Sequence, residues 1–427
     1  MDLNRRQLLQ STAALAGGAS AVSRALQAAP ADAPGAQPNW SAVREDFPWL
    51  KKKLWLTAAD FHPIGVHSIQ AMEEYIKYRE YGPGEGRSNF RKDAETKELY
   101  AQLINAKPSE IAFVQSTTDA ENIVTSAMRL REMKGNVVLD ELHYQASKFL
   151  YHMLEKDGGI QLRVVQHRRD GYWRIDPADM EKAIDRNTRL VSVALVSNIN
   201  GYLHPIKKTA EIAHAHGAYV YGDIIQGAGE TPIDVRAMGI DCAGCGAYKW
   251  LMGDFGFGYL YVREDLQDTV FKPSRFGVRG FTNPNQAQAD SQFRLHPNAS
   301  RYETGSLSYI GAACSHAALQ YIHKLGVENI RAYSKTMTDR LQKEVPKLGY
   351  PAITPPDNNT SIVSFLVPEY EKTIAKINKA FGGETIAFRR WEFTDASGKV
   401  SVPTGMRISP SVYNNQGDID RLLNALS

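Results

Sequence analysis

Between residues 110 and 262, short apolar runs alternate with longer segments whose apolar residues have helical spacing. The apolar runs have the length and composition of buried strands and occupy residues 110–115, 137–140, 162–166, 190–196, 218–221 and 256–262. The segments between them include residues 121–130 and 207–216, where apolar side chains recur at helical intervals. Buried strands that alternate with helices predict an α/β fold with a mostly parallel sheet.

After residue 265 the pattern changes to loop-rich sequence, followed by a helical segment at residues 310–324 and then a mixture of helices and strands. We therefore predict two domains, a large one of residues 55–295 and a smaller C-terminal α+β domain of residues 296–427. Residues 38–54 precede the large domain, and we expect them to pack with the small one.

The composition and charge of the chain limit the kinds of partner that we expect it to bind. The chain has 427 residues, of which 43% are hydrophobic and 23% are charged, and its net charge is +3. This composition is typical of a globular protein, and the nearly balanced charge predicts no nucleic-acid partner. Since no apolar run approaches the roughly 20 residues that a membrane-spanning helix needs, we also expect no membrane span.

Residues 1–31 differ in character from the rest of the chain. Arg5 and Arg6 precede two leucines and a weakly apolar stretch rich in alanine and glycine. Paired arginines in this position are typical of twin-arginine export signals. We predict that residues 1–31 are a signal peptide and spacer, and that the twin-arginine machinery exports the folded protein to the periplasm. A cofactor would then be loaded before export.

The three cysteines, Cys242, Cys245 and Cys314, are too few for a disulfide framework in a chain of 427 residues. Cys242 and Cys245 have the C-x-x-C spacing of redox and zinc motifs, but no second C-x-x-C and no paired histidines accompany them. We interpret both as small buried residues that lead into the following lysine segment, and we expect no metal site.

Candidate catalytic residues directly follow several of the predicted strands. In an open α/β sheet, these positions lie at the carboxyl edge, where ligands bind. Residues 116–118 (Ser-Thr-Thr) open a helix and offer hydroxyls and backbone N–H groups to a phosphate. Tyr144 offers an aromatic ring, and Asp223 offers a carboxylate behind a short strand. Lys249 lies between two aromatic residues, shortly before an apolar run.

Pyridoxal 5'-phosphate (PLP) requires this combination of residues. Its phosphate needs an anion site, its ring a stacking partner, its pyridine nitrogen a carboxylate that keeps it protonated, and its aldehyde a lysine. Burial lowers the pKa of a lysine and so raises its neutral, nucleophilic fraction. We therefore predict a PLP-dependent enzyme in which Lys249 carries the cofactor.

From about residue 55 to its C-terminus, the sequence also resembles the class V aminotransferase family of fold type I PLP enzymes, which includes cysteine desulfurases and isopenicillin N epimerase-like proteins. The motifs that carry the resemblance are STTD at 116–119, VSNING at 196–201, Asp-x-x-Gln at 223–226 and the lysine segment. The resemblance implies these contacts with the cofactor: Thr117 and Thr118 at the phosphate, Tyr144 stacked on the ring with His143 as the second choice, Asn198 and Gln226 at the phenolic oxygen, Asp223 at the ring nitrogen, and Lys249 as the covalent attachment.

The C-terminal part carries further matches to the family. Residues 301–306 (RYETGS) resemble a loop whose last residues reach the cofactor phosphate of the neighbouring subunit. This implies a homodimer with shared active sites and a cofactor contact from Ser306. Arg407 matches the arginine that binds the substrate α-carboxylate, a natural bidentate pair. Arg389 falls on a second arginine of the substrate site.

The sequence departs from the family pattern around the lysine and after Arg389. Gly246-Ala-Tyr-Lys249 stands where the family has Ser-x-His-Lys, so a serine contact to the phosphate is missing and Tyr248 stands in for the histidine. Residues 389–399 contain no cysteine, although the persulfide cysteine of desulfurases should lie there. The missing thiol argues against persulfide chemistry.

Three reactions remain open, because transamination, racemisation and β-elimination all begin when Lys249 removes the Cα proton. A periplasmic address favours a substrate matured outside the cytoplasm, and the resemblance extends to exported class V enzymes that modify the glutamyl side chain of pyoverdine-type siderophores. The first expectation is therefore transamination or oxidative modification of a peptide-borne glutamate. The alternative is an epimerase, racemase or C–S lyase-like reaction on a small amino acid.

Two functions of other classes fit the sequence less well. A binding protein that keeps the fold without catalysis would be expected to lose Lys249 or Asp223, and both are present. A nicotinamide-dependent oxidoreductase would need a G-x-G-x-x-G after the first strand, and none follows residues 110–115.

Overall fold

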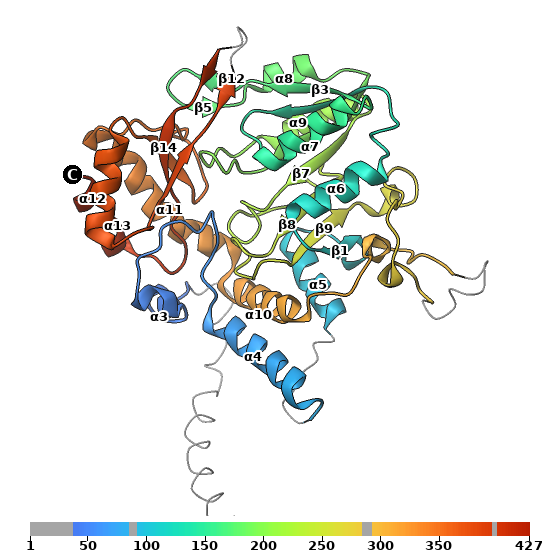
Figure 1. Cartoon of the computed structure of the whole chain (residues 1–427), viewed down its shortest axis with the longest axis horizontal. Helices are drawn as coiled ribbons and strands as arrows, with labels where there is room; N and C mark the ends of the chain where they lie inside the picture. Colours follow the sequence, from blue (N-terminus) through green and yellow to red (C-terminus); the bar gives the residue numbers. More distant parts are fainter. Residues whose placement is uncertain (1–36, 85–91, 284–292, 395–398) are drawn as a thin grey trace, which may run out of the picture. The chain divides into compact units, whose positions relative to one another are not determined.

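A computed structural model describes residues 37–84, 92–283, 293–394 and 399–427, of which residues 39–427 form one compact unit. The predicted export signal, residues 1–31, lies outside the described residues. The unit contains a large sheet and a small C-terminal sheet, drawn in cyan to yellow and in orange to red in Figure 1.

The large sheet has seven strands in the order β1-β9-β8-β7-β6-β2-β3. The strands are β1 (Ile111–Val114), β2 (Asn136–Asp140), β3 (Gln161–Val165), β6 (Thr188–Ala194), β7 (Tyr219–Asp223), β8 (Cys242–Gly246) and β9 (Gly258–Val262). Strand β9 is antiparallel to β1 and β8, and the other strands run parallel to one another. This confirms the predicted mostly parallel α/β sheet, and it brings the carboxyl ends of six strands to one edge.

Helices cover both faces of this sheet, which explains why its strands appear as continuous apolar runs. Neighbouring residues of β2 belong to different cores: Val137 packs in a cluster with Ile123 and Tyr151, whereas Val138 packs in a cluster with Ala213. The helices of this part are α4 (Val66–Tyr81), α5 (Asp93–Leu103), α6 (Thr117–Ala127), α7 (Gln145–Lys156), α8 (Pro177–Ala183), α9 (Ile206–Ala215) and α10 (Tyr309–Leu325). Helix α6 begins earlier than its apolar spacing predicts, because Ser116 caps it.

The C-terminal sheet is antiparallel, in the order β10-β14-β11. Its strands are β10 (Val363–Leu366), β14 (Thr404–Ile408) and β11 (Ala387–Arg390), and the helices of this part are α3 (Trp40–Glu45), α11 (Val327–Glu344), α12 (Tyr370–Phe381) and α13 (Gln416–Leu426). Two short strand pairs complete the structure: β4 (Arg168–Arg169) with β5 (Trp173–Arg174), and β12 (Phe393–Thr394) with β13 (Val400–Ser401). The N-terminal segment contacts this region: Arg44 forms an ion pair with Asp418 at 2.6 Å, and Trp40 stacks on Tyr333. The domain boundary near residue 295 stays a prediction.

Close packing between α6 and β8 depends on glycine. A Cβ atom at Gly244 would lie 2.3 Å from the hydroxyl of Tyr221 and 2.8 Å from Cβ of Ala120. All three cysteines are buried, and two of them lie in β8, as the sequence predicted for the small residues before the lysine. The small side chains of β8 let the N-terminus of α6 lie against the strand that leads to Lys249.

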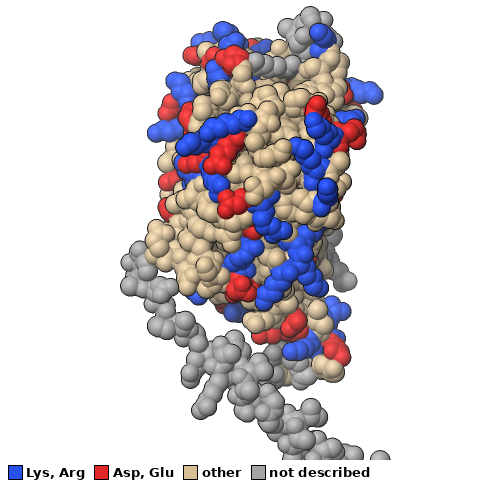
Figure 2. Space-filling view, turned by 90° about the vertical axis from the view of Figure 1, so that its left-hand side faces the viewer, with Lys and Arg blue, Asp and Glu red and all other residues tan. Residues whose placement is uncertain are grey.

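The surface shown in Figure 2 carries interspersed basic and acidic side chains, in keeping with the nearly balanced net charge of +3. Within the described ranges, no helix is long and apolar enough to cross a membrane. The same ranges contain no group of three or more His, Cys, Asp or Glu side chains placed to hold a metal ion.

Candidate active site

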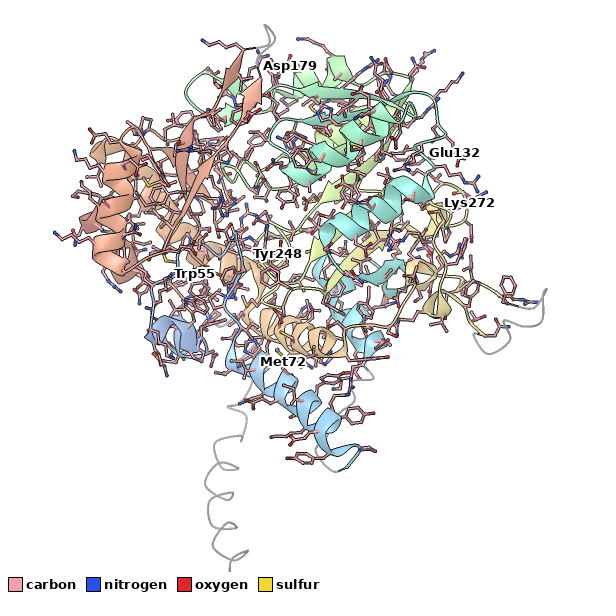
Figure 3. All side chains as sticks on the ribbon, viewed as in Figure 1. Trp55, Met72, Glu132, Asp179, Tyr248 and Lys272 are labelled. Atoms are coloured by element: carbon pink, nitrogen blue, oxygen red, sulfur yellow. The ribbon has the colours of Figure 1, made fainter. Side chains whose placement is uncertain are left out.

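A pocket opens at the carboxyl edge of the large sheet. It is lined by Ser116, Thr117, Thr118, Tyr144, Ala194, Val196, Asn198, Asp223, Ile225, Gln226, Tyr248 and Lys249. Every cofactor-binding residue that the sequence predicted is in this lining except Ser306, which is exposed and lies outside it. Tyr248, labelled in Figure 3, lies between the elements of the large sheet and the C-terminal elements. The residues come together because their strands run parallel and end at the same edge.

One end of the pocket is an anion site at the N-terminus of α6. The hydroxyl of Ser116 accepts a hydrogen bond from the N–H of Asp119 at 3.1 Å and so caps the helix. The N–H groups of the first helical residues, Thr117 and Thr118, have no acceptor within the helix, and the helix dipole favours negative charge there. The hydroxyl of Thr117 accepts from the N–H of Gly246 at 2.9 Å, which leaves its hydrogen free to donate. This end fits a phosphate.

Lys249 lies in the turn between β8 and β9 and is 8% exposed. Its Nζ atom is 5.9 Å from the ring centre of Tyr144 and 5.6 Å from that of Tyr248. Burial, followed by the positive charge of Arg407, lowers the pKa of Lys249 to about 8, against the opposing effect of Asp223. A substantial fraction of this amine is therefore neutral near pH 8 and can act as a nucleophile or base.

Asp223 ends strand β7 and is 4% exposed. Its Oδ1 atom accepts a hydrogen bond from the N–H of Ile225 at 3.1 Å. Burial raises the pKa of Asp223 to about 6, although that hydrogen bond and the charge of Lys249 oppose the increase. At neutral pH the group is mainly a carboxylate with little solvent around it, so a cationic partner such as a protonated ring nitrogen would be held strongly.

Asn198 and Gln226 supply amide groups to the same pocket. The Oδ1 atom of Asn198 is buried and has no hydrogen-bond partner among the described residues, which points to a ligand group there. Gln226 is held on both sides: its Nε2 donates to the carbonyl of Ala59 at 3.0 Å, and its Oε1 accepts from the indole N–H of Trp250 at 2.9 Å. One N–H of Gln226 remains for a ligand. Together with the anion site, Asp223 and Lys249, these groups fit PLP.

Tyr144, rather than His143, presents its ring to the pocket. Tyr144 is 41% exposed, whereas His143 is buried outside the lining. His143 accepts from the N–H of Tyr144 at 2.7 Å, and its Nε2 lies 2.9 Å from the hydroxyl of Ser192. That hydroxyl donates to Glu121 at 2.8 Å. The sequence did not indicate this buried network of hydrogen bonds, which fixes the backbone N–H of Tyr144 through His143.

Arg407 and Arg389 come from neighbouring strands, β14 and β11, and meet at a residue that the sequence analysis did not identify. Arg407 is 2% exposed; its Nη1 donates to the carbonyl of Asn198 at 2.6 Å, and its Nη2 donates to Asp60. Arg389 donates to the same Asp60 oxygen at 2.5 Å. Neither arginine lines the pocket itself, but Arg407 adjoins it through Asn198. Asp60 lies before the predicted strands, so no local pattern marked it.

No thiol lies in the pocket lining. Cys242, Cys245 and Cys314 are all buried and unpaired, and they are the only cysteines of the chain. Burial raises the pKa of each thiol, to about 12 for Cys314. Because the thiolate is the reactive form, these residues are poor nucleophiles at neutral pH.

Comparisons with known proteins found similar sequences. The family model described as aminotransferase class-V matches residues 69–422. A probable cysteine desulfurase of Methanothermobacter thermautotrophicus is 32% identical over 344 residues, which are 78% of this chain and 83% of that protein.

Solved structures are similar over most of their length. A mutant of C-DES with glycine covalently linked to its PLP cofactor has a TM-score of 0.77 and 19% identity, over 90% of this chain and 98% of that one. The complex of the cystine C–S lyase C-DES with its product, cysteine persulfide, has a TM-score of 0.76 and 20% identity, over 89% and 98%. At these identities the likeness shows the fold alone, and it confirms the expected fold type I architecture.

The burial of Asp223 predicts a pH-dependent cost in stability. Its pKa is about 6 in the folded protein against an ordinary value of 3.8, so the folded protein binds the proton more tightly than the unfolded chain does. Relative to high pH, the protein is therefore more stable below pH about 4, and this stability is lost as the pH rises through 6. We expect Asp223→Asn to stabilise the cofactor-free protein at pH 8 by up to about 3 kcal/mol, with the gain vanishing toward pH 4. Urea unfolding at several pH values measures this gain.

The exposed ion pair of Asp170 with Arg174 provides the matched control. Asp170→Asn should change the free energy of unfolding by less than about 1 kcal/mol at any of these pH values. A destabilised Asp223→Asn protein at pH 8 would contradict the account of Asp223 as a desolvated carboxylate.

Proposed function

Because the chain belongs to the aminotransferase class-V family and is therefore a PLP-dependent enzyme, we propose that it removes the Cα proton of a small amino acid and eliminates a sulfur leaving group from Cβ. The observation that carries this proposal is a buried lysine and a buried carboxylate that line the same pocket, in which no thiol lies. The names of the relatives, a probable cysteine desulfurase and a C–S lyase, support sulfur-bearing amino acids as substrates.

The pocket residues would hold the cofactor, and Lys249 would transfer the proton. PLP, when bound, supplies an electron-withdrawing ring that delocalises the electron pair left at Cα. Thr117 and Thr118 would hold its phosphate at the N-terminus of α6, Tyr144 would stack on its ring, and Asp223 would pair with its ring nitrogen. Gln226 would donate a hydrogen bond to its phenolic oxygen, and Asn198 would contact the same oxygen through its side-chain amide, with Tyr248 beside them.

Lys249 acts as the base that takes the Cα proton. Its pKa of about 8 is close to neutral pH, and a base transfers protons most effectively when its pKa lies near the pH of the reaction. Arg407 would bind the substrate α-carboxylate through guanidinium N–H groups. Loss of the Cα proton and of the Cβ–S bond, with both bond electrons leaving on sulfur, yields a thiol; addition of water then yields a keto acid and ammonia.

The first expectation from the sequence was transamination or oxidation of a siderophore glutamyl side chain. The relatives support the C–S lyase alternative better, because their names concern cysteine and cystine. Racemisation begins with the same proton transfer by Lys249 and would appear in the same assay as exchange of the Cα proton without release of sulfur.

Two further proposals concern assembly and location. We propose a homodimer with shared sites, in which the exposed Ser306 reaches the partner's phosphate site; its place outside the pocket of its own chain is compatible with that role. We also propose export to the periplasm by the twin-arginine machinery, on the evidence of Arg5 and Arg6 in the sequence.

The cofactor assignment predicts one labelled lysine. After borohydride reduction of the PLP-loaded protein, peptide mass mapping should find the cofactor on Lys249, and Lys249→Ala should abolish both the label and the yellow colour. Lys148 is the matched control, since it is half-buried and its pKa is also lowered by burial. Lys148→Ala should retain the label, whereas a labelled peptide elsewhere in Lys249→Ala would refute the assignment.

The reaction predicts that no cysteine of the protein takes part. A variant with Cys242→Ala, Cys245→Ala and Cys314→Ala should unfold at a lower temperature, because it loses buried side chains, yet keep turnover of cysteine within about threefold. Sulfide and pyruvate should form in equal amounts. Loss of turnover in a folded variant, with alanine as product and sulfur bound to the wild-type protein, would restore the desulfurase mechanism.

A further inference from the structure

Asp60 connects the two arginines at the substrate end of the site. Its Oδ1 atom accepts hydrogen bonds from Nη2 of Arg407 and from Nη2 of Arg389, and its Oδ2 atom accepts from the hydroxyl of Thr57 at 2.9 Å. Burial by itself would raise the pKa of Asp60, but the charges of both arginines hold it below its ordinary value. Asp60 is therefore ionised at neutral pH.

Arg407 keeps a donor that the protein does not use. Its Nη1 and Nη2 atoms donate to Asn198 and Asp60, but its buried Nε–H has no hydrogen-bond acceptor among the described residues. An unsatisfied buried donor is unfavourable, and a guanidinium donor is best satisfied by a carboxylate. The cluster therefore keeps one donor, the Nε–H of Arg407, that a ligand carboxylate could satisfy in addition to Asp60.

The charges of the cluster allow one ligand carboxylate and disfavour two. Arg407 and Arg389 carry two positive charges, and Asp60 carries one negative charge, which leaves a net charge of one. A single ligand carboxylate balances this charge. A second would lie near the carboxylate of Asp60 without a further arginine to pair with, and like charges that lie close together in a partly buried site repel each other.

We infer that Asp60 is a specificity-determining residue: an internal carboxylate that takes the place of a second substrate carboxylate and restricts the site to amino acids with one carboxylate near the cluster. This inference rests on the proposed function, in which Arg407 binds the α-carboxylate. It favours cysteine-like substrates over aspartate and glutamate. It also differs from the first expectation from the sequence, which was a peptide-borne glutamate as the substrate.

Binding of unreactive carboxylates tests the inference without relying on turnover. Glutarate is butyrate with a second terminal carboxylate, so calorimetric titration of the holoenzyme with both isolates the effect of that group. The wild-type protein should bind butyrate more tightly than glutarate. Asp60→Asn keeps the size of the side chain and removes its charge, and it should tighten glutarate binding about tenfold while changing butyrate binding by less than about threefold.

Two further variants complete the test. Glu384 lines the same surface cavity as Asp60 and Arg389, and it forms no ion pair with either arginine within the described ranges. Glu384→Gln removes the same charge and should leave the ratio of the two affinities unchanged. Arg389→Gln leaves Arg407 paired with Asp60 and removes the net positive charge of the cluster, so it should weaken butyrate binding. If Asp60→Asn does not fold, an unchanged butyrate affinity in Arg389→Gln would contradict the charge balance on which the inference rests.

The outcomes separate this inference from the proposed function. An unchanged affinity ratio in folded Asp60→Asn, or a wild-type preference for glutarate, would overturn the role of Asp60 while leaving Arg407 as a carboxylate site. Failure of the wild-type protein to bind either carboxylate would remove Arg407 from substrate binding and overturn this inference. The proposed elimination would still be judged by its own readout, the equal formation of sulfide and pyruvate from cysteine.

Discussion

The burial of Lys249 close to Asp223 is the constraint on which the rest of the site depends. Withdrawal from water moves the two pKa values toward each other, down to about 8 for the lysine and up to about 6 for the aspartate. In water these groups would be a strongly protonated amine and an ordinary carboxylate. The pocket therefore contains a base that works near neutral pH and a carboxylate that strongly attracts a cation.

The large sheet produces this burial, and the C-terminal sheet completes it. Parallel strands bring Asp223, Asn198 and the N-terminus of α6 to one edge, and the hairpin of β8 with β9 places Lys249 there. Arg407 of β14 then donates to the carbonyl of Asn198 at 2.6 Å. This contact joins the loop after β6 to the C-terminal sheet at the point where substrate and cofactor would meet, and the charge of Arg407 helps to lower the pKa of Lys249.

Local patterns in the sequence predicted most of this arrangement, because most of it is local. Strand ends are visible as apolar runs, and residues that follow parallel strands must share an edge, so Thr117, Asn198 and Asp223 could be placed together. Asp60 could not, because its partners are 329 and 347 residues away and no periodicity encodes such ion pairs. For the same reason, the sequence identified the two arginines but not the carboxylate between them.

The rate at which Lys249 captures PLP tests the central claim most directly, because only the neutral amine attacks an aldehyde. The cofactor-free protein would be mixed with PLP at a series of pH values and the covalent product trapped by borohydride. If Lys249 has a pKa of about 8, the rate should rise with pH and level off above that value. A rate that continues to rise toward the ordinary lysine pKa of 10.5 would show that the pocket does not desolvate Lys249, and the account would be wrong.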